Sequence, residues 1–224
     1  MYCHFHLPQV MRRLMCFRQQ GLRNAAGFIF LMAACVLMGT TPLNAQSIPA
    51  EITVNARVNT GAVSGDADDP AIWIHPTDPA QSLVIGTDKL AGFLYVWDMS
   101  GRELQRIAVV KEPNNVDVRS GMLVGGAPVD ICVVNAQSPS RFVVFKIDPA
   151  TRTLTNISAG TGVPAPELKN PYGLCLYRRP SDSAMFVFGT TNGGDQKNIR
   201  QYRLMDNGAG KVTGVHVRAF GSAY

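Results

Sequence analysis

The 224-residue sequence contains few of the residues that build disulfide frameworks or zinc sites. It holds 5 cysteines and 4 histidines, and only Cys132 and Cys175 lie beyond residue 45. Two cysteines in apolar, strand-like segments are a weak disulfide framework, so we expect either buried free thiols or a single bridge. No Cys/His spacing indicates zinc, and His75 and His216 stand alone in strand-like segments.

Acidic residues are missing from the first part of the chain. Residues 1–45 contain four arginines and no Asp or Glu, so most of the formal net charge of +5 belongs to this segment. The remainder holds 17 basic and 16 acidic residues and is nearly neutral. Nucleic-acid binding needs a basic patch or stripe, so we expect no nucleic-acid partner.

The N-terminal apolar run is too short to span a bilayer. Gly27–Gly39 provides 13 apolar or small residues after a basic region, which is typical of the core of a signal peptide. We therefore predict that residues 1–45 are a signal peptide and that the protein is secreted or periplasmic, without stable membrane insertion. Two alternatives stay open: translation starting at Met11 or Met15, and a lipid anchor at Cys35.

Helical periodicity is also missing. From residue 46 onward, short strand-like runs are separated by turn residues about every ten positions. The hydrophobic fraction of 46% is ordinary for a globular protein, so disorder is not expected as the main state. Residues 46–224 are therefore predicted to form an all-β domain.

The predicted domain repeats one pattern three times. Each unit has four strand-like runs, and a turn rich in Asp, Gly or Asn joins the third run to the fourth, as a tight hairpin requires. The runs of the three units are DPAIWIHP, SLVIGTDK, GFLYVWDMSG and RELQRIAV; NVDVRSG, VDICVVNA, RFVVFKIDPAT and RTLTNISA; and PYGLCLYRR, AMFVFGTTN, IRQYRLMDNGAG and KVTGVHVRAF.

Four-stranded units of about 45 to 55 residues are typical of β-propeller blades. A β-sandwich is the alternative, but it does not predict threefold internal similarity. In a propeller the first strand of each blade lines the central channel, so the loops that enter the first strands meet at one end. These loops contain GDADDP, EPNNVD and KNPYG.

The loop GDADDP places Asp66, Asp68 and Asp69 directly before an apolar run. A solvated acidic turn is one interpretation, and a hard-cation site is the other, because clustered carboxylates repel one another unless a metal offsets them. The predicted convergence favours the cation. Five residues would then surround one opening with the oxygen ligands that Ca²⁺ takes: Asp68, Asp69, Asn115, Asp117 and Tyr172. Lys89, at the end of a second run, is either placed to bind phosphate or a solvated loop lysine.

Five segments, in their order and spacing, carry a family resemblance. GDADDPAIWIHP, TDKLAGFLYVWDMSGREL, NNVDVR, PYGLCLY and DNGAGKVTG resemble the β-propeller phytases over roughly residues 50–220. These are calcium-dependent enzymes that hydrolyse phosphomonoesters of myo-inositol hexakisphosphate, or phytate.

The resemblance implies a six-bladed propeller that binds several Ca²⁺ ions at one end and uses metal-activated water as a phosphoric monoester hydrolase. The expected substrate is phytate or another inositol phosphate, and the complete protein is expected to be a monomer. By position, Asp68 and Asp69 are similar to calcium ligands, whereas Lys89 and Tyr172 are similar to catalytic residues. Asn115 and Asp117 match the motif and are expected to support the site.

The sequence also departs from the family pattern. Gln137 stands where the family usually has a phosphate-binding Arg, and Arg141 is a speculative replacement. Residues 190–194 stand where the family often has a Lys-Glu pair. The chain ends at Tyr224 after three units, so we expect a truncated propeller that is inactive alone. Two other functions stay open: a propeller that binds calcium or a ligand without catalysis, and a phosphodiesterase or sugar-processing propeller.

Overall fold

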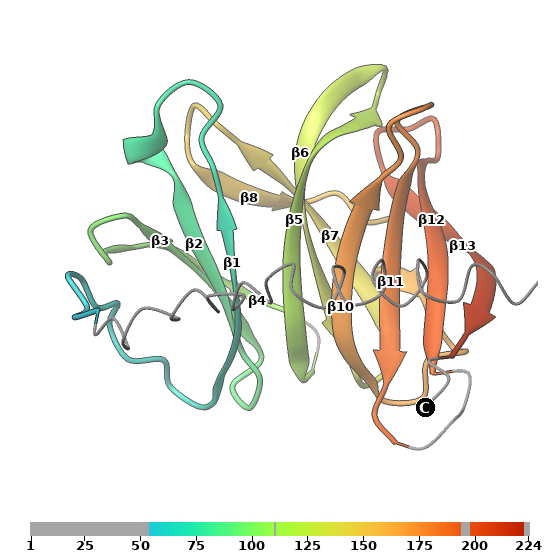
Figure 1. The fold of residues 1–224 in the computed structure, drawn as a ribbon, viewed down its shortest axis with the longest axis horizontal. Helices are drawn as coiled ribbons and strands as arrows, with labels where there is room; N and C mark the ends of the chain where they lie inside the picture. The colour runs from blue at the N-terminus through green and yellow to red at the C-terminus, as the bar shows by residue number, and fades with distance from the viewer. Residues whose placement is uncertain (1–53, 110, 194–197, 222–224) are drawn as a thin grey trace, which may run out of the picture. The chain divides into compact units, whose positions relative to one another are not determined.

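The computed structural model describes residues 54–109, 111–193 and 198–221, which fold into three antiparallel sheets (Figure 1). The first sheet has the order β1 (Ala67–Trp73), β2 (Leu83–Asp88), β3 (Phe93–Asp98) and β4 (Glu103–Ala108). The second has the order β5 (Pro113–Val124), β6 (Ala127–Ala136), β7 (Arg141–Asp148) and β8 (Thr153–Asn156). The third has the order β10 (Pro171–Arg178), β11 (Met185–Thr191), β12 (Ile199–Asp206) and β13 (Val212–Phe220). Each sheet is one blade, and the predicted all-β propeller architecture is confirmed.

Two local features were not expected from the repeat. β5 and β6 extend beyond the predicted runs into a long hairpin that turns at Gly125 and Gly126, both with positive φ. A two-residue strand, β9 (Val163–Pro164), pairs with β7 and adds a fifth strand to the second sheet. The described residues also contain a short 3₁₀ turn, η2 (Pro79–Gln81).

The predicted signal peptide lies outside the described residues. Among the residues that are described, no helix has the length and apolar character needed to cross a membrane.

The predicted hairpin turns share one local structure. The first aspartate of each turn accepts a hydrogen bond from the backbone N–H two residues later, which favours a tight turn. The three bonds are from Ser100 to Asp98 at 2.9 Å, from Ala150 to Asp148 at 2.8 Å, and from Gly208 to Asp206 at 3.1 Å.

The second blade contributes to both hydrophobic cores of the described domain. Successive side chains of a strand point to opposite faces, and β6 follows this rule. Ile131 and Val133 lie in the core shared with the third blade, whereas Cys132 and Val134 lie in the core shared with the first. This explains why the middle of β6 is a continuous apolar run.

Both cysteines beyond residue 45 are free thiols. Cys132 is buried, and burial, together with the negative charge of Asp117, raises the pKa of its thiol. Cys175 is exposed, so the expectation of burial was wrong there. Leu176, its neighbour on β10, faces the core with the second blade, which places Cys175 on the opposite face.

The first strands of the three blades lie next to one another. β1, β5 and β10 cross the middle of Figure 1 in that order, and β5 packs against both of the others. The N-terminal ends of these strands therefore come together, as the sequence analysis predicted.

Candidate functional site

Each first strand carries a β-bulge close to its start. The register with the second strand shifts between Ala67 and Pro70, between Pro113 and Val116, and between Pro171 and Leu174. Two first-strand residues therefore lie opposite one residue of the second strand. Bulges of this kind occur at barrel rims and beside active sites, where they redirect side chains. The bulge residues are Asp68 and Asp69, Asn114 and Asn115, and Tyr172 and Gly173.

Three predicted site residues meet at these bulges. Lys89 directly follows β2, and its Nζ lies 3.6 Å from Oδ2 of Asp68. The same Nζ lies 5.4 Å from the ring centroid of Tyr172, a cation–π distance. The Lys89 side chain is 23% exposed and Tyr172 is 47% exposed, so both can be reached from solvent. A cation, a carboxylate and a phenol from the first and third blades thus share one place.

Asp69 and Asp117 link neighbouring first strands. Oδ2 of Asp69 accepts a hydrogen bond from the backbone N–H of Val116 at 3.0 Å. Oδ2 of Asp117 accepts one from the N–H of Leu176 at 2.7 Å, and Arg119 lies 3.6 Å from the same oxygen. Each carboxylate therefore satisfies a backbone donor of the next blade.

Asn115 contributes to the bulge of the second blade. Its backbone N–H donates to Oδ1 of Asn135 at 2.7 Å, and its own Oδ1 accepts from Nδ2 of Asn114 at 2.9 Å. The structure thus places Asn115 beside the other bulges and gives its side chain a partner within the protein.

The acidic turn is organised by a fourth carboxylate, Asp88, which is fully buried. Its oxygens accept hydrogen bonds from the backbone N–H groups of Gly65 and Asp66, both at 2.9 Å, and of Ala91 at 3.1 Å. The hydroxyl of Ser64 donates at 3.1 Å. Burial raises the pKa of Asp88, but these hydrogen bonds to the charged form outweigh it and hold the pKa below its usual value. A buried anion therefore holds the turn in shape.

The described residues do not by themselves complete a metal site. Nowhere in the described ranges do three His, Cys, Asp or Glu side chains group in a way that could hold a metal ion. Asp68 forms an ion pair with Lys89, and one carboxylate oxygen of Asp69 accepts a hydrogen bond from the N–H of Val116. The buried Oδ1 of Asn114 has no hydrogen-bond partner among the described residues. These donors are all oxygens, which fits Ca²⁺, but Ca²⁺ takes six to eight of them.

Gln137 and Arg141 lie in different surroundings. Nε2 of Gln137 donates to the carbonyl of Pro171 at 3.1 Å, directly before Tyr172. Arg141 donates to the carbonyls of Pro139 at 3.3 Å and Thr161 at 3.1 Å. The structure thus brings Gln137 to the bulges, whereas Arg141 binds the backbone of Pro139 and Thr161 away from them. Gly194, at the end of the segment 190–194, lies outside the described residues.

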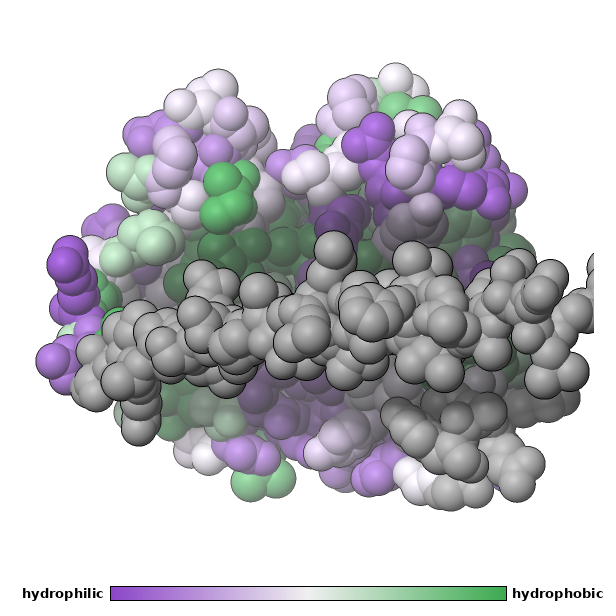
Figure 2. All heavy atoms as spheres, viewed as in Figure 1, coloured by the Kyte–Doolittle hydropathy of each residue, from purple (hydrophilic) through white to green (hydrophobic). Residues whose placement is uncertain are grey.

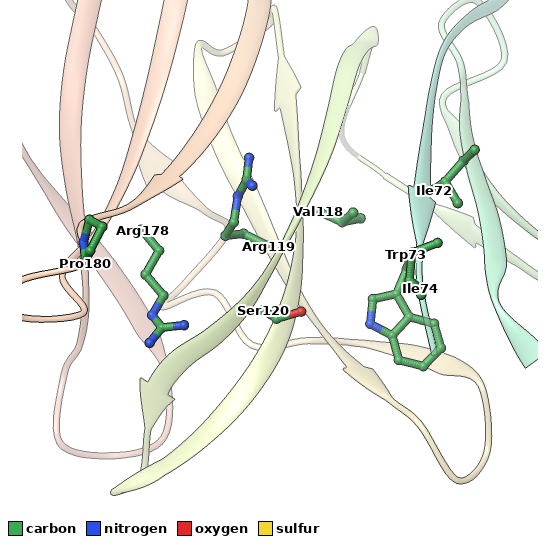
Figure 3. A pocket seen from close by; sticks show the side chains of 8 residues that line it. All are labelled: Ile72, Trp73, Ile74, Val118, Arg119, Ser120, Arg178 and Pro180. Atoms are coloured by element: carbon green, nitrogen blue, oxygen red, sulfur yellow. The ribbon is translucent and has the colours of Figure 1, made fainter. Parts of the chain in front are cut away.

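A cavity of about 540 Å³ lies among the later parts of the first strands. Figure 2 shows the upper edge of the molecule hollowed between two raised parts, with hydrophobic residues in the hollow. The cavity includes Arg119 and Arg178, whose guanidinium groups point in opposite directions (Figure 3). Arg119 donates to the carbonyl of Leu176 at 2.7 Å and Arg178 to the hydroxyl of Ser183 at 3.1 Å. Because the arginines diverge and are engaged elsewhere, they do not form an anion clamp.

A smaller cavity, of about 440 Å³, adjoins the acidic bulge. Residues 60–63 and Trp97 line it together with Asp68, Asp69 and Thr87. The first bulge is therefore accessible beside the cluster of Lys89 and Tyr172.

Sequence reasoning missed Asp88, Thr87, Asn114 and Asn135. Asp88 is part of the TDK motif that drew attention to Lys89, and an aspartate at the end of a buried apolar strand is itself a signal. Asn114 and Asn135 are 1% and 0% exposed. Their roles depend on contacts between blades, which a reading of one strand at a time does not contain.

Comparisons with known proteins identify the family of the chain. The sequence profile of the phytase family matches residues 19–223. The 3-phytase of Bacillus subtilis (strain 168) is 33% identical over 206 residues, which cover 89% of this chain and 51% of that enzyme. The chain thus spans about half the length of this curated relative. A crystal structure of a proposed 6-phosphogluconolactonase from Bacteroides fragilis NCTC 9343 covers 67% of this chain and 39% of its own, with a TM-score of 0.40 and 13% identity. The match to the family profile over nearly the whole chain shows that this protein belongs to the phytase family.

Proposed function

We propose that this chain carries the phosphate-binding part of an exported, calcium-dependent phytase that hydrolyses phosphomonoesters of inositol phosphates. One observation carries the proposal: Lys89, Asp68 and Tyr172 meet at the bulges of two blades. The N-terminal sequence supports export to the periplasm or the medium.

The residues of this cluster have complementary roles. Lys89 donates to a phosphate oxygen as a compact positive charge. Asp68, at 3.6 Å, orients the ammonium group while the site is empty of substrate. The Tyr172 hydroxyl can donate a hydrogen bond to phosphate, and its ring face stabilises the lysine cation.

Calcium is part of the proposal. Asp68 and Oδ1 of Asp69 would hold it, together with oxygen ligands from outside the described residues. The bound ion would supply positive charge that offsets the charge of the phosphoryl group during transfer.

A second candidate is a propeller that binds inositol phosphates without hydrolysing them. The contact of Gln137 favours it, because a neutral amide bound to the carbonyl of Pro171 replaces a charged, bidentate phosphate ligand.

The test is equilibrium binding of phytate to the full chain in millimolar calcium. We expect Lys89→Met to weaken binding at least tenfold, equivalent to about 1.4 kcal/mol. Lys146→Met, which changes an exposed lysine of β7, is the matched control and should leave the affinity unchanged.

Equal phytate affinities for the wild type and Lys89→Met would show that Lys89 does not bind phosphate and is a solvated loop lysine. Release of inorganic phosphate by the wild type would establish the hydrolase over the binding protein.

A further inference from the structure

One position of the second strand faces the bulge in every blade. The residues at this position are Thr87, Asn135 and Thr190, which lie opposite the three pairs of bulge residues. Thr87 and Asn135 are buried, with exposures of 2% and 0%. Polar side chains this deeply buried require hydrogen-bond partners.

Within its own blade, each of these side chains accepts the same backbone hydrogen bond. The donor is the N–H of the second bulge residue, which the bulge removes from the ladder between strands. The three bonds are Asp69 to Thr87 at 3.1 Å, Asn115 to Asn135 at 2.7 Å, and Gly173 to Thr190 at 2.8 Å.

The same side chains also reach the next blade. The Thr87 hydroxyl donates to the carbonyl of Asn114 at 2.8 Å, and Nδ2 of Asn135 donates to the carbonyl of Tyr172 at 2.6 Å. Both acceptors are the first bulge residue of the following blade. Thr87 and Asn135 thus tie one bulge to the next, although they differ in chemistry.

Tyr172 receives a second bond of this kind. Nδ2 of Asn114 donates to its carbonyl at 3.2 Å, and Asn114 is itself held by Thr87. The carbonyl of Tyr172 is therefore held by two side chains of the second blade, and one of these residues is held in turn by the first blade. A fixed backbone sets the direction of the ring that lies beside Lys89.

We propose that Thr87 and Asn135 are positioning residues, which fix the successive bulges and so hold Tyr172 against Lys89. The effect on substrate rests on the proposed function, whereas the placement of Tyr172 does not. Such a residue must offer both an acceptor and a donor, as Thr and Asn do and Val and Leu do not. Loss of the partner also leaves buried N–H and C=O groups unsatisfied.

The repeat supplies the matched variants. Asn135→Leu removes both contacts, whereas Asn135→Thr installs the residue found at the same position in the first and third blades. Thr87→Val replaces the hydroxyl of Thr87 by a methyl group of similar size. This variant should remain folded and provides the test if Asn135→Leu does not fold. Ser158→Ala is the control, because it removes a buried hydroxyl that bonds to the backbone of Val144 on β7, away from the bulges.

The first readout is the NMR signal of the Lys89 side-chain methylenes, which the ring of Tyr172 shifts; loss of that shift in Tyr172→Leu assigns it. We expect the shift to be lost in Asn135→Leu, reduced in Thr87→Val, and retained in Asn135→Thr and Ser158→Ala. The second readout is phytate affinity, which should fall at least tenfold in Asn135→Leu and recover in Asn135→Thr.

The two readouts separate the two proposals. A folded Asn135→Leu or Thr87→Val variant that keeps the Lys89 shift would overturn the positioning role. Absence of phytate binding in every variant, including the wild type, would refute the proposed function and leave the shift as the test of positioning.

Discussion

At the scale of single residues, Asp88 shows why an acidic turn can precede a core strand. The buried negative charge belongs to Asp88 at the end of β2 and not to the turn itself. The oxygens of Asp88 accept hydrogen bonds from the backbone N–H groups of the turn. The aspartates of the turn are left free for other partners, such as Lys89 for Asp68.

Asp88 should make stability depend on pH. Its pKa is lowered in the folded state, so its contribution is complete above the unfolded pKa of about 3.9 and is lost as pH falls through the folded pKa. Asp88→Asn places an amide N–H group against N–H donors and should lower the urea midpoint strongly at pH 7. The difference from the wild type should shrink below about pH 4. A difference that stays constant from pH 7 to pH 3 would contradict this account.

At the scale of strands, the order of the elements can be predicted from the sequence, but the joints between blades, which are hydrogen bonds from one first strand to the next, cannot. The alternating and continuous apolar runs predicted all twelve principal strands, because burial on one or two faces leaves a local pattern. Asp69 and Asp117 were expected to face a metal or support its site. Each also accepts a hydrogen bond from an N–H of the next blade, and these partners lie 47 and 59 residues away in the sequence, where no local pattern identifies them.

The joint made by Asp117 should be worth much more than a surface ion pair. Asp117→Ala leaves the N–H of Leu176 without its acceptor and should cost about 1.5 to 3 kcal/mol in unfolding free energy. Glu103→Ala, which breaks the exposed pair with Arg106, should cost less than about 1 kcal/mol. Urea denaturation measures the unfolding free energy of both variants. Equal losses of unfolding free energy would mean that the bond from Leu176 to Asp117 stabilises the fold no more than a surface ion pair does.

At the scale of the whole domain, the second blade holds the first and third in place. Its strands β6 and β7 send alternate side chains into two cores, and β5 packs against both β1 and β10. The threefold repeat predicted that blades stack. It did not predict the series of hydrogen bonds that runs through the second blade from Thr87 to Tyr172.

The two cores should respond separately to substitution. Val133 and Val134 are adjacent but lie in different cores, whereas Ile131 and Val133 share one. In double-mutant cycles, Val133→Ala and Val134→Ala should add within about 0.5 kcal/mol, and Ile131→Ala and Val133→Ala should couple more strongly. The reverse order of coupling would show that strain passes through the backbone of β6.

This alternation has a consequence for how the protein can diverge. In the middle of β6, the odd-numbered side chains lie in the core shared with the third blade, and the even-numbered side chains lie in the core shared with the first. A substitution and its compensating change can therefore accumulate on one side of the strand while the other side keeps its original residues. The odd-numbered and even-numbered residues of one strand can therefore evolve independently of each other, each set together with the blade that it contacts.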